Sequence, residues 1–329
     1  DYLREEYERV NRAIAELSGA PQQLGIFDLD RRILQQNLFG VDLNPESVEI
    51  PRLSLWLKTA RRDQPLSNLD HNIRCGNSLV EPSGADAPQA LKDAFAGLPP
   101  DTRAFDWPTA FPEVFARGGF DVVVGNPPYV RQEILGPFKP YLARRYATWH
   151  GAADLYVYFY ERGLDLLAPA GKLSYIVTNK WLRAGYGEPL RRFFTERAEI
   201  EEILDFGHAP IFEDADTFPC IIVAHPRPAA PPAAEPPVVR VCPVPRDRST
   251  ELPLDNYVHE HGYPVPWSRY GAEPWSLEPP EVEDLMRKIR ERGTPLAEFI
   301  GAKPMYGIKT GLNEAFLIDE MTRADLIRE

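Results

Sequence analysis

Residues 126–129, Asn-Pro-Pro-Tyr, directly follow the apolar and β-branched stretch FDVVVG (120–125). Two prolines in succession lack backbone N–H donors and confine the preceding residue to extended backbone shapes, so a buried strand has to end here. Asn126 supplies a side-chain carbonyl acceptor, Pro127 a backbone carbonyl of fixed direction, and Tyr129 a flat ring. This combination suits a planar ligand that carries an amino group.

The chemistry that such a site could perform is attack by a weakly nucleophilic amine. The lone pair of an amino group is delocalised when the group is conjugated with an aromatic ring. Two acceptors that bind its protons favour a pyramidal nitrogen and direct the lone pair toward an electrophile, so no histidine or carboxylate base is required. We predict Asn126, Pro127, Pro128 and Tyr129 as catalytic residues, although a lone Asn-Pro-Pro-Tyr can also be an ordinary loop.

Short apolar runs alternate with amphipathic helical patterns over residues 1–225. This alternation predicts an α/β fold with a doubly wound, mostly parallel, Rossmann-like sheet that is covered on both faces. Ligands of open α/β sheets lie beyond the carboxyl ends of the strands, which is where Asn126 stands. The expected strands are 38–43, 72–76, 120–125, 172–179, 201–206 and 220–226, and the expected helices are 1–17, the stretch after Asn44, 154–171 and 186–200.

Three features interrupt this regular pattern. Residues 81–112 are rich in Ala, Gly, Pro and Asp and predict an irregular excursion. Pro51 is expected to kink or break the helix in which it lies. Residues 226–253 are proline-dense and predict a linker with one short strand, which separates a catalytic domain over 1–225 from a mixed α+β segment over 254–329.

The composition excludes several classes of protein. The net charge of 37 − 49 = −12 argues against nucleic-acid binding driven by overall charge, although a local basic groove is compatible with it. No apolar run is long enough to span a bilayer, and no signal peptide opens the chain. Cys75, Cys220 and Cys242 form no CxxC pair, so neither disulfides nor a zinc site is expected, and a reducing cytoplasm fits best.

The order of the motifs resembles that of amino-group DNA methyltransferases of the Asn-Pro-Pro-Tyr class, as in large, type IIG-like restriction–modification enzymes of prokaryotes. These enzymes transfer a methyl group from S-adenosylmethionine to N6 of adenine in double-stranded DNA. The similarity covers most of residues 30–320. Among the stretches that carry it are VVVGNPPYV (122–130), FGVDLNPESVEI (39–50), IRCGNSL (73–79), APIFEDADTFPCIIV (209–223) and YGIKTGLNEAFLID (306–319).

The resemblance implies a binding site for the cofactor. Asp42 would bind the ribose hydroxyls of S-adenosylmethionine, Leu43 would pack on its adenine, and Asn77 would contact the same adenine. Ser78 belongs to the same motif as Asn77 and is expected in this site as well. Structural roles also fit two of these residues, because Asp42 could begin an Asx turn or help to cap a helix, and Asn77 could be a turn residue.

The resemblance also implies a site for the target base. An adenine extruded from the duplex would lie between the rings of Tyr129 and Phe212, and its amino group would bond to Asn126 and Pro127. Residues 254–329 would begin a target-recognition domain. Weaker candidates for contacts with DNA are Arg183, Lys309 and Asn313.

One motif of the family is missing, the glycine-rich Phe-x-Gly-x-Gly turn that cradles the methionine moiety. The chain begins without methionine, so we expect it to be part of a longer protein. Because the glycine-rich motif is absent, we expect the central strand and part of the cofactor site to be absent as well: either they lie upstream in the longer protein, or the chain cannot methylate alone. A nuclease, if there is one, would be fused or associated outside it. Two alternatives stay open: related Asn-Pro-Pro-Tyr enzymes methylate RNA or glutamine side chains, and a DNA-specificity module without chemistry would fit the acidic charge. No metal is expected.

Overall fold

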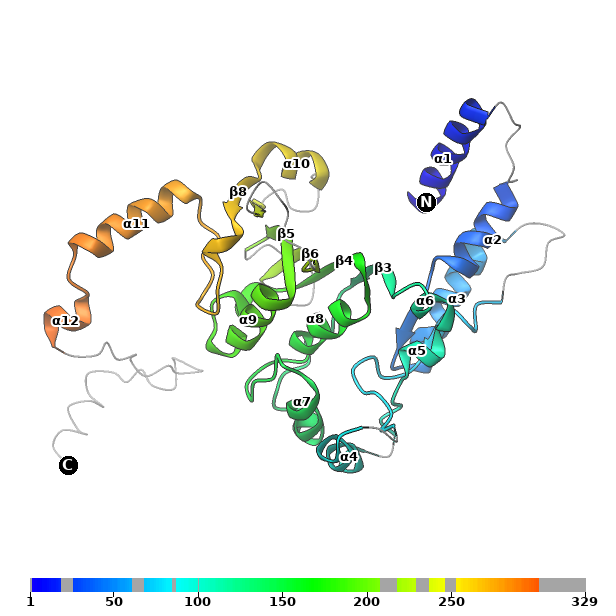
Figure 1. Cartoon of the computed structure of the whole chain (residues 1–329), viewed down its shortest axis with the longest axis horizontal. Coiled ribbons are helices and arrows are strands. Elements are labelled where there is room, and N and C mark those ends of the chain that lie inside the picture. The colour runs from blue at the N-terminus through cyan, green and yellow to red at the C-terminus, as the bar shows by residue number, and fades with distance from the viewer. Residues whose placement is uncertain are drawn as a thin grey trace, which may run out of the picture. The chain divides into compact units, whose positions relative to one another are not determined.

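The computed structural model describes residues 2–18, 26–60, 68–84, 87–99, 101–207, 218–228, 237–245 and 253–301 of the chain. Contacts divide the chain into two units, Asp1–Leu277 and Glu278–Glu329. This division falls beyond the expected linker 226–253, because β7 (Val238–Pro243) within that stretch pairs with β5 (Ala198–Asp205). The first unit contains all the described strands (Figure 1).

The described strands form two sheets. β1 (Gly40–Asp42) and β2 (Ile73–Cys75) are a parallel pair in which Asp42 lies opposite Cys75. The other sheet has the strand order β3-β4-β6-β5-β7-β8. Its members not yet named are β3 (Phe120–Gly125), β4 (Leu167–Thr178), β6 (Pro219–Pro226) and β8 (Tyr263–Pro266).

The α/β class is confirmed, but the larger sheet is mixed rather than mostly parallel. β3 pairs with β4, and β5 with β7, in parallel. β6 runs antiparallel between β4 and β5, and β8 runs antiparallel to β7. An apolar run predicts that a strand is buried but does not fix its direction, so the composition of β6 could not reveal its orientation.

Helices cover the sheet and supply much of the core. α8 (Tyr156–Asp165) packs against β4, α9 (Glu188–Arg197) packs against β5, and the two helices contact each other (Figure 1). Tyr156, Tyr160 and Phe194 of these helices are fully buried, so aromatic rings make up a large part of the interface with the sheet. The other helices are α1 (Tyr2–Ser18), α2 (Ile26–Gln36), α3 (Pro45–Thr59), α4 (Gln89–Ala96), α5 (Trp107–Ala110), α6 (Pro112–Phe115), α7 (Lys139–Arg145), α10 (Leu254–His261), α11 (Pro280–Arg292) and α12 (Leu296–Ile300).

The start of α3 agrees with the sequence prediction, and of the two effects expected at Pro51, a kink or a break, the break does not occur. The side-chain oxygen of Asn44 accepts a hydrogen bond of 2.9 Å from the backbone N–H of Glu46, and Pro45 occupies the first helical position, where no N–H is needed. The helix continues through Pro51 to Thr59, so the expected break of a turn does not occur. A proline removes one hydrogen bond from the helix, and the bonds of the neighbouring turns remain.

Two other predicted segments differ in extent. α8 ends at Asp165 rather than near Gly171, because β4 already begins at Leu167. The expected irregular excursion over 81–112 contains α4, α5 and the first residue of α6, and these helices are short. Proline and aspartate therefore interrupt the chain here without excluding helical turns between them.

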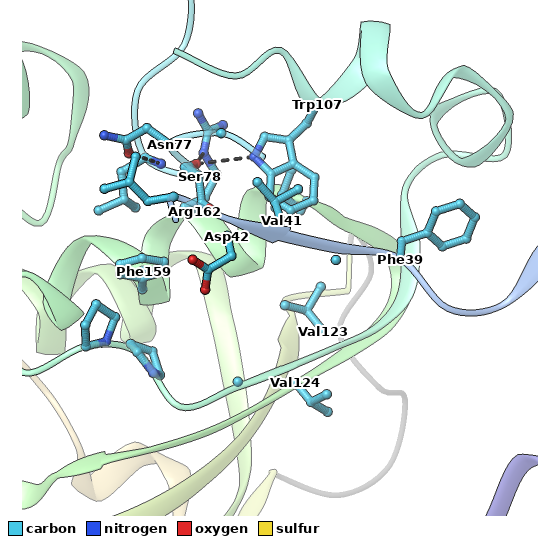
Figure 2. Close-up of a pocket in the computed structure, with 18 of the residues that line it drawn as sticks. Phe39, Val41, Asp42, Asn77, Ser78, Trp107, Val123, Val124, Phe159 and Arg162 are labelled. Carbon is cyan, nitrogen blue, oxygen red and sulfur yellow. Dashed lines mark hydrogen bonds between the residues drawn. The ribbon is translucent and has the colours of Figure 1, made fainter. Parts of the chain in front are cut away.

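β1 and β3 each have one edge without a strand partner among the described residues, since β1 pairs only with β2 and β3 only with β4. The sequence predicts a buried third strand, yet the side chains of Val122 and Val124 in β3 are 60% and 72% exposed. Figure 2 shows β1 and β3 beside the same cavity, running in the same direction. The two open edges therefore border one space.

Candidate active site

A cavity of 1510 Å³ runs along β1 and β3 and is also lined by the residues that follow the carboxyl ends of β1, β2 and β3. Asp42 ends β1, and Leu43 and Asn44 follow it; the loop Gly76–Ser78 leaves β2, and Asn126–Pro128 leaves β3. Figure 2 shows the carboxylate of Asp42 directed toward the chain that leaves β3. The structure thus brings together residues that the sequence separates widely, at the edge where ligands of α/β sheets are held.

Asp42 begins a turn that leaves part of its carboxylate available. Its Oδ1 accepts a hydrogen bond of 2.8 Å from the backbone N–H of Asn44, so the structural role considered from the sequence is present. Asp42 is exposed, and no described residue bonds to its Oδ2. Leu43 beside it has 52% of its surface exposed. A carboxylate oxygen and an apolar surface therefore face the cavity at the end of β1.

The loop after β2 is tied to β1 and to its own turn. The backbone N–H of Gly76 donates to the carbonyl of Asp42 at 2.9 Å, and the N–H of Asn77 donates to the carbonyl of Arg103 at 2.7 Å. Oδ1 of Asn77 accepts a hydrogen bond of 3.1 Å from the N–H of Leu79. Because this bond fixes the oxygen end of the amide, the NH₂ end is the part of Asn77 that can donate to a ligand.

Asn126 and Pro127 present two acceptors without partners in the described parts of the chain. No described residue donates a hydrogen bond to the side chain of Asn126 or to the carbonyl of Pro127. Gly125 before them packs against the ring of Tyr175, which a Cβ atom would approach to 3.1 Å. The end of β3 is therefore held against the core while its two acceptors remain free.

Tyr129 contributes a ring and not a base. Its ring centroid lies 6.4 Å from that of Tyr156, and 36% of the residue is exposed. Burial raises the pKa of Tyr129 to about 12, so its hydroxyl is protonated at neutral pH. Tyr129 is not among the residues that line the cavity, whereas its neighbours Asn126, Pro127 and Pro128 are.

The remaining predicted site residues are only partly described. Arg183 is exposed and follows the 3₁₀ turn Asn179–Leu182 at the end of β4. Phe218, before β6, lies near Lys180, whose Nζ is 5.8 Å from the ring centroid. Phe212, Lys309 and Asn313 lie outside the described residues.

Two residues that the sequence did not single out organise the loop after β2. Trp107 Nε1 and Arg162 Nε both donate hydrogen bonds to the carbonyl of Ser78, at 3.3 and 3.1 Å (Figure 2). Both side chains also line the cavity. No spacing signal could have identified them, because they lie 29 and 84 residues from Ser78 in the sequence.

Two further classes of site find no support in the described part of the chain. It contains no group of three His, Cys, Asp or Glu side chains that could hold a metal ion. None of its helices combines the length and the apolar character that crossing a membrane requires.

Comparison with known proteins agrees with the site. Residues 36–212 match the Eco57I restriction-modification methylases. The chain is 34% identical over 214 residues to the type II methyltransferase M.PaeR7I of Pseudomonas aeruginosa, a match that covers 62% of this chain and 36% of the relative. It is 36% identical over 218 residues to the type II methyltransferase M.XhoI of Xanthomonas vasicola, covering 62% and 38%. It is 29% identical over 209 residues to the type II restriction enzyme and methyltransferase RM.Eco57I of Escherichia coli, covering 60% and 19%.

The matched region extends from the residues before β1, through all three cavity loops, to the end of β5 and beyond. The chain belongs to the Eco57I restriction-modification methylase family. The resemblance inferred from the motifs is confirmed at this level. The matches span less than two fifths of the length of these relatives, so the activity of the whole protein is a matter for proposal.

Proposed function

We propose that the protein containing this chain is an adenine-specific DNA methyltransferase of a restriction–modification system. It transfers the methyl group of S-adenosylmethionine to N6 of adenine in double-stranded DNA. One observation carries the proposal: Asp42 at the end of β1 and the free acceptors of Asn126 and Pro127 at the end of β3 line the same cavity. A cofactor held at the first position and a base held at the second would meet in that space.

The residues at the ends of β1 and β2 fit an adenosine moiety. The free oxygen of Asp42 suits the ribose hydroxyls, because a carboxylate accepts two such bonds well. Leu43 offers its half-exposed side chain to the adenine ring, and Asn77 offers the NH₂ group of an amide fixed at its oxygen end. Ser78 belongs to the same loop and lines the same cavity. When bound, S-adenosylmethionine supplies an electrophilic methyl group.

The residues after β3 fit the amino group of an adenine. The side-chain oxygen of Asn126 and the carbonyl of Pro127 accept its two protons, and Pro128 keeps the chain extended. The ring of Tyr129 stacks on the base, and its raised pKa keeps the hydroxyl neutral, so the residue acts by positioning. Phe212 is proposed for the opposite face of the base. Extruding the base from the duplex costs about a few kcal/mol, which contacts on both faces offset.

The open edges of β1 and β3 support a further part of the proposal. Val122 and Val124 expose most of their surface beside the cavity, an unusual state for valines in an apolar strand. We propose that a parallel strand from elsewhere in the complete protein lies between β1 and β3. Such a strand would carry the glycine-rich turn for the methionine moiety, which the chain lacks.

The contacts with DNA are proposed for residues outside the cavity. Arg183 at the end of β4 is the described candidate, and Lys309 and Asn313 are expected to act in a target-recognition domain that follows the first unit. A local basic surface has to provide these contacts, because the chain as a whole carries a charge of −12. Any nuclease activity would reside in another part of the protein or in a partner.

The proposal is tested with the complete natural protein, tritiated S-adenosylmethionine and unmethylated genomic DNA. After digestion to nucleosides, label is expected in N6-methyl-2′-deoxyadenosine. Label in another deoxynucleoside would reject the assignment to N6 of adenine. Label in RNA or protein but not in DNA would reject DNA as the substrate. Absence of cofactor binding would support a DNA-specificity module without chemistry.

A further inference from the structure

α8 carries two adjacent charged residues that are almost fully buried. Glu161 and Arg162 are 5% and 4% exposed. Buried charges are tolerated in proteins only where hydrogen bonds satisfy them. The carboxylate of Glu161 accepts the backbone N–H groups of Ala147 and Thr148, at 3.1 and 2.9 Å. Glu161 thus fixes the loop before α8.

Arg162 holds the loop that follows β2. Its Nε donates to the carbonyl of Ser78 at 3.1 Å, and its Nη1 donates to Oε1 of Glu81 at 2.5 Å. The carbonyl of Ser78 also accepts the Nε1–H of Trp107 at 3.3 Å. A single carbonyl in the cavity wall is therefore fixed from two sides, by α8 and by α5, and it belongs to the residue directly after Asn77.

A second arginine shares part of this arrangement. Nε of Arg145 donates to Oε2 of Glu81 at 3.1 Å, and its Nη2 lies 3.4 Å from Asp165. Burial opposes ionisation of Glu81, but Arg162 and Arg145 outweigh it and lower the pKa of that carboxyl. Arg145 makes no described hydrogen bond with Ser78. Both arginines therefore bond to the carboxylate of Glu81, and only Arg162 also bonds to the carbonyl of Ser78.

We infer that Arg162, together with Trp107, is a positioning residue that orients Asn77 toward the adenine of the cofactor. The inference rests on the proposed function. The oxygen of the Asn77 amide is fixed by the N–H of Leu79, so its NH₂ group is the end that would donate to an accepting ring nitrogen of a bound adenine. Adenine offers an acceptor at N1, whereas hypoxanthine carries a proton there. A fixed Asn77 therefore favours an adenosyl over an inosyl cofactor, and a displaced one loses this preference.

The test uses the complete protein and two probes, S-adenosylhomocysteine and S-inosylhomocysteine, with binding measured by calorimetry. Arg162→Lys keeps a positive charge for Glu81 but cannot reproduce the fork that also reaches Ser78. We expect this variant to bind S-adenosylhomocysteine about tenfold more weakly, the effect of losing one charged hydrogen bond. Its affinity for S-inosylhomocysteine should change much less. In methyl transfer the loss falls on the KM for S-adenosylmethionine more than on kcat.

Trp107→Phe is the second variant, since it removes the other donor to Ser78 and retains an aromatic ring. Its effect is expected in the same direction, and the double variant with Arg162→Lys should lose less than the product of the single effects. Arg145→Lys is the matched control, because it disturbs Glu81 without touching Ser78. It should leave the preference for the adenosyl compound unchanged.

The outcomes separate the two proposals. If the unmodified protein binds neither S-adenosylmethionine nor S-adenosylhomocysteine, the proposed function fails and the inference fails with it. If the unmodified protein binds and methylates, but Arg162→Lys and Arg145→Lys change the preference equally, Arg162 has only a structural role. An unchanged preference in Trp107→Phe would overturn the inference even if Arg162→Lys did not fold.

Discussion

The backbone N–H of Gly76 donates a hydrogen bond of 2.9 Å to the carbonyl of Asp42, so the loop after β2 is fastened to the last residue of β1. The bond connects Asp42, which is proposed to bind the ribose, to the loop Gly76–Ser78, which is proposed to bind the adenine. A Cβ atom at position 76 would lie 2.4 Å from Cδ2 of Phe105, so this position accommodates glycine and no larger residue without rearrangement. The geometry at this end of the cavity therefore depends on the absence of a side chain at Gly76.

Gly76→Ala is expected to destabilise the protein and to weaken cofactor binding together. Overpacking of this kind costs about 1–3 kcal/mol, since Phe105 belongs to a packed aromatic cluster and cannot move freely. Chemical denaturation and calorimetry measure the two effects. Gly84→Ala is the control, because a Cβ there has no neighbour within 4 Å. Equal stability of the two variants would contradict the packing argument.

Asp42→Ala should reduce the affinity for S-adenosylmethionine by about 10- to 100-fold, the range expected when a charged hydrogen-bonding partner is lost. Asp42→Asn is the matched variant, because an amide retains an acceptor for the N–H of Asn44 and for the turn. It should fold normally and still lose affinity. Wild-type affinity in Asp42→Asn would show that Asp42 serves the turn alone.

Asn126→Ala is expected to lower methyl transfer by at least about 100-fold, because one of two acceptors for the amino group is lost in the transition state. Cofactor affinity should stay within about twofold of the original, since Asn126 lies at the end of β3 and Asp42 at the end of β1. Single-turnover transfer of tritiated methyl measures the first quantity and calorimetry the second. Substantial turnover by Asn126→Ala would reject the proposed role.

Tyr129→Phe should retain most of the activity and Tyr129→Ala should lose it, because the ring and not the hydroxyl is used. Burial raises the pKa of Tyr129 from its usual value of 10 to about 12. The folded state therefore holds this proton more tightly than the unfolded state, and the associated stability is complete below pH 10 and is lost as the pH rises toward 12. A pH–rate profile from pH 6 to 9 should be identical for wild type and Tyr129→Phe. An alkaline limb that disappears in Tyr129→Phe would mean that the hydroxyl takes part.

Local hydrogen bonds explain why part of the site could be predicted from the sequence. A turn and a helix start are formed within a few residues by Asp42, Asn44 and Pro45. Residues that are adjacent in the sequence therefore suffice to predict them. The end of β3 before Asn126 was also predictable from adjacent residues, because two prolines in succession cannot continue a strand.

Contacts over long sequence distances explain what the sequence did not reveal. Trp107 and Arg162 converge on Ser78 only because α5 and α8 fold against the same loop. β6 runs antiparallel between β4 and β5, and a run of apolar residues carries no information on direction. The exposure of Val124 could not be predicted from the sequence either, because an apolar strand looks the same in the sequence whether or not a neighbouring strand covers it.

Val124→Asp tests the proposed strand between β1 and β3. If a strand covers this site in the complete protein, the change buries an unpaired charge, and it should lower the melting temperature and the cofactor affinity. Val238→Asp is the control, because Val238 in β7 is 55% exposed in a sheet position away from the cavity. Hydrogen exchange gives an independent measure, as the amides of β3 on its open edge should be protected in the complete protein and exchange rapidly in the polypeptide of residues 1–329. Equal effects of the two aspartates, together with rapid exchange in the complete protein, would show that the edge of β3 stays open and that the methionine moiety is held in another way.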